Sequence, residues 1–132
     1  MRQVIIGVVL SVVLAGCGAA ERLIDAVLPT STPVISQAEI TMTICNLPEK
    51  YAKVTDAGHT LILDGDGEDF NGGLKIEELA CALNYMEVPS FVINIMDNTR
   101  AIDGIQREEY GNFKISWSYH PDNGLDVVIT EK

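Results

Sequence analysis

The strongest structural signal in this sequence is a pair of segments near the C-terminal end in which apolar and more polar residues alternate. The first segment covers residues 113–119 and the second covers residues 125–130. A period of two is typical of β-strands that bury one face. Residues 120–124, His-Pro-Asp-Asn-Gly, have the composition of a hairpin loop. With another strand over 106–110 and a tight turn at 111–112, the sequence predicts a three-stranded antiparallel meander.

Two stretches upstream also predict strands. Apolar and polar residues alternate over residues 40–45, which places Cys45 on the polar side of a half-buried strand. Residues 60–63 form a second β-rich run, which ends at an Asp-Gly-Asp-Gly turn signal. The segment between them, residues 46–59, is interpreted as a loop or a single helical turn.

Helical spacing appears in the middle of the chain. Apolar residues of the segment 75–86 fall within an arc of about 120° at the helical period. Residues 89–96 favour a second, short helix, although their β-branched content makes a strand the alternative. The order strand, strand, helix, helix and then three strands predicts an α+β domain. We expect a small, largely antiparallel sheet of about five strands, with one or two helices on one face.

The N-terminal end has the pattern of a targeting signal. An apolar run from Val4 to Leu14 is about 11 residues long, shorter than the roughly 20 of a membrane-spanning helix, and it fits a signal-peptide core. The run closes on Leu14-Ala15-Gly16-Cys17, which resembles the lipobox of bacterial lipoprotein precursors at all four positions. The resemblance implies removal of residues 1–16 and attachment of a diacylglycerol to the Cys17 thiol. An ordinary secretory signal cleaved near Ala19 or Ala20 is the alternative.

These signals divide the chain into three parts. Residues 1–16 are the expected lipoprotein signal peptide, 17–37 the lipidated cysteine with a flexible tether, and 38–132 a single α+β domain. Removing residues 1–16 from the 132-residue chain leaves 116, enough for one domain with a modest core. In an exported protein we expect Cys45 and Cys81 to form a disulfide, with two buried free thiols as the alternative.

The charge balance restricts the partners. The net charge is −10 at pH 7, which opposes binding to nucleic acid or to anionic lipid head groups. The same charge is compatible with a cationic protein of the cell envelope as the partner. The alternative is that the charge only keeps the tethered domain soluble.

One acidic, glycine-rich segment suggests a hard cation such as calcium. Its oxygen-donor residues are Asp64, Asp66, Glu68, Asp69 and Asn71. An EF-hand that begins at Asp64 would need Gly at position 69 and Glu at position 75, where this chain has Asp and Lys. An acidic turn before the next helix is therefore the preferred interpretation, and no cofactor is expected.

No residue set predicts catalysis. His59 and His120 lie far apart in the sequence, and no nucleophile elbow or phosphate-binding glycine loop accompanies them. A serine–His120–Asp122 arrangement is the least favoured interpretation. We therefore expect a protein that is not an enzyme.

A second resemblance covers roughly the last 70 residues. Residues 96–104, Gln106 and residues 117–125 resemble a group of small uncharacterised actinobacterial proteins, some of them phage-encoded. That group implies a fold unit and a source, and it implies no activity. Within the first of these segments, Arg100 flanked by Asp97 and Asp103 predicts a local ion-pair cluster.

The combined prediction is a non-catalytic binding or accessory lipoprotein of the cell envelope, held outside the cytoplasm by the lipid on Cys17. Gly18 follows that cysteine where an inner-membrane lipoprotein would have Asp, which favours the outer membrane in a two-membrane host. A calcium-dependent module, a phage exclusion protein and, least favoured, an envelope hydrolase are the alternatives. The expected contact surface comprises Arg100, Trp117, Tyr119, His120 and Asp122.

Overall fold

The structure is a computed structural model that describes residues 34–68 and 72–132. Its elements are, in order, α1 (Gln37–Ile44), β1 (Ala52–Thr55), η1 (Asp56–Gly58), β2 (Thr60–Asp64), α2 (Ile76–Tyr85), α3 (Ser90–Asp97), η2 (Ala101–Asp103), β3 (Gln106–Tyr110), β4 (Phe113–His120) and β5 (Gly124–Glu131). They belong to one compact unit, Val34–Lys132. Cys17 and the rest of the expected signal peptide and tether up to residue 33 lie outside the described residues.

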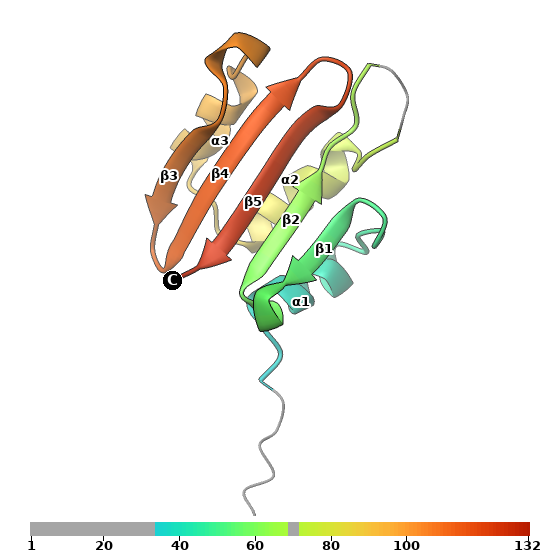
Figure 1. Ribbon diagram of the computed structural model, residues 1–132. Coiled ribbons are helices and arrows are strands. Elements are labelled where there is room, and N and C mark those ends of the chain that lie inside the picture. The colour runs from blue at the N-terminus through green and yellow to red at the C-terminus, as the bar shows by residue number, and fades with distance from the viewer. Residues whose placement is uncertain (1–33, 69–71) are drawn as a thin grey trace, which may run out of the picture. The chain divides into compact units, whose positions relative to one another are not determined.

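The five strands form one antiparallel sheet in the order β1-β2-β5-β4-β3. Figure 1 shows the helices behind one face of this sheet, while the other face looks toward the viewer without a covering element. The last strand of the chain, β5, lies between β2 and β4 and pairs with both along its length. The predicted α+β class and the C-terminal meander of β3, β4 and β5 are confirmed, with three helices in the described residues.

The N-terminal element is a helix, so the predicted strand over residues 40–45 is wrong. Ser36 begins α1 with a capping box: its hydroxyl accepts from the Glu39 backbone N–H at 3.1 Å, and the Glu39 carboxylate accepts from the Ser36 backbone N–H at 2.9 Å. These bonds satisfy two groups that a helix start leaves free. The buried positions of this segment are Ala38, Thr41 and Cys45, which is helical spacing. The alternation over 40–45 therefore does not describe which residues are buried.

The first strand is β1, which lies within residues 46–59, so the loop or helical turn that the sequence predicts there is wrong for residues 52–55. Ala52 and Val54 face the helices, and β1 pairs with β2 from Ala52↔Leu63 to Thr55↔Thr60. The connection η1 has three successive residues with positive φ, at 53°, 54° and 97°. Only the last of them is glycine, Gly58, whose Cα lies so close to Ser36 that a side chain there would clash. The turn thus lacks the usual glycine-rich signal.

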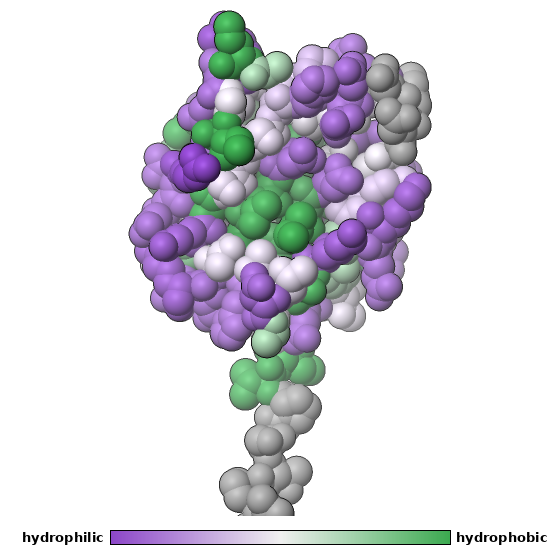
Figure 2. All heavy atoms as spheres, viewed as in Figure 1, coloured by the Kyte–Doolittle hydropathy of each residue, from purple (hydrophilic) through white to green (hydrophobic). Residues whose placement is uncertain are grey.

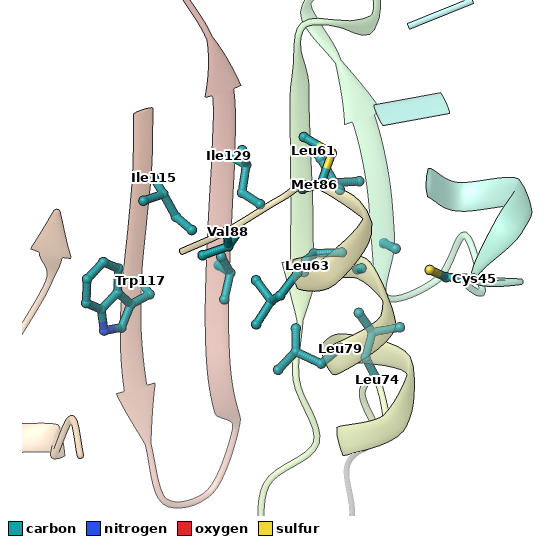
Figure 3. Close-up of a cluster of buried hydrophobic side chains, with 14 of the residues drawn as sticks. Cys45, Leu61, Leu63, Leu74, Leu79, Met86, Val88, Ile115, Trp117 and Ile129 are labelled. Carbon is teal, nitrogen blue, oxygen red and sulfur yellow. The ribbon is translucent and has the colours of Figure 1, made fainter. Parts of the chain in front are cut away.

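The core lies between the sheet and the helices, and Figure 3 shows its centre. Leu61 and Leu63 of β2 and Val127 and Ile129 of β5 are fully buried, because these strands occupy the middle of the sheet. Both predicted helices are confirmed: α2 contributes Leu79, Ala82 and Leu83, and α3 contributes Val92 and Met96.

A disulfide joins Cys45, which follows α1, to Cys81 of α2, as predicted. The two Cα atoms are 5.8 Å apart, and the residues are separated by 36 positions in sequence. Closing a loop of that length removes about 4 kcal/mol of denatured-state entropy in the chain-entropy account. The cross-link attaches α1 to the side of α2 that faces away from its main apolar stripe.

Candidate functional site

The uncovered side of the sheet, which we call the open face, carries an ordered set of side chains. One row crosses all five strands and consists of Lys53, Ile62, Val128, Ser116 and Arg107, each a direct register partner of the next. Aliphatic side chains therefore form the centre of the row and cations form its two ends. Figure 2 shows this apolar centre, surrounded by hydrophilic residues.

A second row lies on the side of the open face nearest η1. It consists of Thr55, Thr60, Thr130, Lys114 and Glu109. Lys132, which follows β5, donates to the Glu109 carboxylate at 2.6 Å. This hydrogen bond, with the charges of Lys132 and Lys114, lowers the pKa of Glu109. Glu109 is thus held between two lysines.

A third row has the opposite charge. Asp64 at the end of β2 pairs in register with Asp126 of β5, and Asp126 pairs with Ser118 of β4. Partial removal from water, together with the hydrogen bond and the charge of Asp64, raises the pKa of Asp126 to about 6, while His120 acts in the opposite direction. Asp126 therefore keeps its proton to a higher pH than an isolated aspartate does.

Two hollows lie on the open face, on either side of its aliphatic centre. The β3-side hollow, of about 450 Å³, is lined by Arg107, Glu108, Glu109, Lys114, Ile115, Ser116, Val128 and Thr130. Glu108 pairs in register with the buried Ile115, so these two side chains alternate to the helix-covered side, whereas Glu109 lies on the open face. The β1-side hollow, of about 380 Å³, is lined by Lys50, Tyr51, Lys53, Ile62, Leu63, Asp64, Asp126, Val127 and Val128. Because Val128 lines both, the two hollows are parts of one continuous surface.

The basic residues of the domain gather around this face. Nine Lys and Arg occur in the chain, and two of them precede residue 34. Five of the other seven lie on the open face or at its rim: Lys50, Lys53, Arg107, Lys114 and Lys132. The carboxylates there are Glu109, Asp64, Asp126 and, at a corner beside Lys50, Asp122. In a domain with seventeen acidic residues, the open face is the less acidic side.

The described members of the acidic segment considered for calcium lie in different places. Asp64 faces Asp126 on the sheet, whereas Asp66 and Glu68 lie in a loop whose backbone donates to Leu74 O at 3.1 Å and to Pro121 O at 2.8 Å. Asp69 and Asn71 lie outside the described residues. Within residues 34–68 and 72–132, no group of three His, Cys, Asp or Glu side chains could hold a metal ion. Calcium binding, the less favoured interpretation of this segment, stays an untested alternative.

Trp117 is a core residue, so its expected place on a contact surface is wrong. Only 2% of Trp117 is exposed, and its indole N–H donates to the Thr99 hydroxyl at 2.9 Å. Tyr119 is half-buried on the same helix-covered side of β4. Alternation along β4 places both residues beneath the helices, because one side of the strand packs against the core.

The remaining predicted contact residues are exposed. His120 and Asp122 lie at the β4–β5 turn, with His120 Nδ1 at 3.6 Å from Asp122 Oδ2. Arg100 pairs with Asp103 at 3.2 Å and lowers the pKa of that carboxyl, first through its backbone N–H and then through its side chain. The ion pair predicted after α3 is present with Asp103. No ion pair between Arg100 and Asp97 occurs among the described residues.

The cations of the open face were missed by sequence reasoning. Arg107 and Lys114 occupy polar positions of alternating strands, which the sequence indicates only as a solvated side. The predicted turn at 111–112 already implies the pairing of β3 with β4 that brings Arg107 and Lys114 together, whereas the position of Lys53 in the same row depends on the insertion of β5 between β2 and β4.

Comparisons with known proteins found no similarity: no protein-family model, no curated protein and no solved structure matches this chain. None of the helices in the described ranges is long and apolar enough to cross a membrane. The disulfide between Cys45 and Cys81 fits a domain that folds in an oxidising compartment.

Proposed function

We propose that this protein is an exported lipoprotein that is anchored through Cys17 and acts by binding a partner rather than by catalysis. The lipobox sequence at residues 14–17 supports the anchor. The disulfide of the folded domain supports export, because such bonds persist outside the reducing cytoplasm. A lipid anchor of this kind attaches a domain to the membrane without a spanning helix.

The main support for a binding role is the open face of the sheet. A five-stranded antiparallel sheet with one uncovered side presents a broad, rigid surface. Here that surface combines an aliphatic centre, hydroxyl groups and most of the basic residues of the domain. Ile62 and Val128 are only partly buried there, so a partner that covered them would remove further apolar area from water.

The anchoring step is tested by the substitution Cys17→Ser, with Gly18→Ala as the matched control. We expect the wild-type chain and Gly18→Ala to sediment with membranes in a processed form, and Cys17→Ser to remain as the unprocessed precursor. Globomycin, which inhibits lipoprotein signal cleavage, should cause the wild-type precursor to accumulate. A Cys17→Ser protein that is cut to the normal size and stays with the membrane would contradict the proposal.

A further inference from the structure

We propose that the β3-side hollow binds an extended acidic peptide segment that also carries aliphatic side chains. The inference rests on the proposed binding function and names the site and the chemical class of its partner. Its central residues are Arg107 and Lys114, with Ser116, Thr130 and Val128 between them and the middle of the sheet.

The spacing of the two cations fits an extended peptide. Arg107 of β3 is the register partner of Ser116, and Lys114 lies two residues from Ser116 on β4. The two cations are therefore diagonal neighbours on one face, about 7 Å apart at the backbone. Alternate residues of an extended peptide also repeat at about 7 Å. Two acidic side chains at positions i and i+2 of such a peptide would each meet one cation.

The chemistry of the lining matches carboxylates. The Arg107 guanidinium can hold a carboxylate by two parallel N–H bonds, and the Lys114 ammonium adds a compact positive charge. Ser116 and Thr130 place hydroxyl donors beside Lys114 and Arg107. Glu109 also lines the hollow, directly opposite Lys114, and is bonded to Lys132 at 2.6 Å. On this part of the open face the three cations Arg107, Lys114 and Lys132 therefore outnumber the single carboxylate of Glu109. The hollow thus has positive charge to offer to a ligand.

The acidity of the whole protein does not cancel this local charge. Most carboxylates of the described residues lie outside the open face, and the sheet and the helix layer separate the open face from the far side of the domain (Figure 1). Packed layers are about 10 Å apart, and charges farther apart than about 8 Å are largely screened at physiological salt. A ligand in the hollow therefore responds mainly to the nearby cations. The net charge of the whole chain favours a cationic partner. Such a partner would fit the acidic surface outside the open face.

The aliphatic centre favours a peptide over a purely polar polyanion. Val128 lines the hollow and pairs in register with Ile62 at the middle of the open face. A phosphate or uronate polymer would leave these side chains in water, whereas valine or leucine side chains between the acidic residues of a peptide would cover them.

The test is fluorescence anisotropy with the full chain purified in nonionic detergent. The probe is a fluorescein-labelled peptide of alternating residues, Glu-Val-Glu-Leu-Glu-Val-Glu. We expect saturable binding that weakens with added salt, and at least a tenfold loss of affinity for Arg107→Glu and for Lys114→Glu. Lys75→Glu is the matched control: it makes the same change in net charge at an exposed residue before α2, and it should retain the wild-type affinity.

Two further probes decide the ligand class. The same peptide with serine in place of valine and leucine should bind more weakly, and inorganic polyphosphate should compete poorly. No binding at low salt, or an equal loss in the Lys75→Glu control, would overturn the site. Polyphosphate that binds as tightly as the peptide would overturn the peptide assignment. Because the assay uses purified protein, its result is independent of lipidation, and failure of anchoring would appear only in the Cys17→Ser fractionation.

Discussion

We expect the stability of the fold to fall as the pH rises, because of the Asp64–Asp126 pair. The pKa of Asp126 in the folded protein is about 6, against an ordinary value of 3.8, because it is partly removed from water and lies beside Asp64. As the pH rises, the unfolded chain loses this proton first. The stability contributed by the protonated carboxyl is therefore fully present below about pH 4 and is lost as the pH rises through about 6.

The magnitude follows from the two pKa values. A carboxyl with this difference between folded and unfolded states would lose up to about 3 kcal/mol across the interval. Asp126 is exposed, however, and solvent screening of a surface pair reduces that figure to about 1 kcal/mol. The substitution Asp126→Asn removes the ionisable group with little change in size. We expect it to raise the free energy of unfolding by about 1 kcal/mol near neutral pH and to change it little in acid.

Urea unfolding, followed by the fluorescence of the buried Trp117, measures this difference at about pH 7.5 and about pH 3.5. Asp64→Asn should raise the free energy of unfolding by a similar amount, because it removes the other carboxylate of the same repulsive pair. The double variant should gain less than the sum of the two single variants, because both remove one interaction. An equal gain at both pH values, or full additivity in the double variant, would refute the reasoning.

Three further predictions concern what holds the domain together. The paired substitutions Cys45→Ser and Cys81→Ser should lower the free energy of unfolding by about 4 kcal/mol, measured in urea, because the cross-link closes a long loop; no loss would mean that the bond does not form. Ser36→Ala should cost about 1 kcal/mol and reduce the helical circular dichroism, because it removes the cap of α1; an unchanged melting curve would argue against that helix start. Leu63→Ala should cost about 2 to 5 kcal/mol, because the side chain is fully buried in β2; a loss below 1 kcal/mol would contradict the core described above.

The C-terminal half was predictable because its signals agree with one another. In β4 and β5 the apolar residues alternate over a long stretch, and the loop between them contains Pro, Asn and Gly. Pattern and turn chemistry therefore point to the same hairpin. The structure pairs β4 with β5 over eight residues, from Phe113↔Glu131 to His120↔Gly124.

The N-terminal part was misread because two local signals compete there. Ile40 and Ile44 belong to the alternation that predicted a strand, yet in the folded chain they are 36% and 60% exposed. The capping box of Ser36 and Glu39 favours a helix instead, and tertiary packing decides the outcome through the buried Thr41. In this segment the helix-start signal outweighs six residues of alternation.

The open face was the part least accessible to sequence reasoning. Polar positions of strands predict only that a side is solvated. Which of those positions meet depends on strand order, and nothing local indicates that β5 enters between β2 and β4. The row from Lys53 to Arg107 and the contact of Asp64 with Asp126 both follow from that insertion.

The central claim is that the folded domain is attached to a membrane through lipid on Cys17. Mass spectrometry of the protein extracted from membranes tests it directly, after cleavage with trypsin. We expect the first peptide to be Cys17–Arg22, with the added mass of a diacylglycerol on the cysteine and no peptide from residues 1–16. An unmodified Cys17, or a chain that begins elsewhere, would contradict the account.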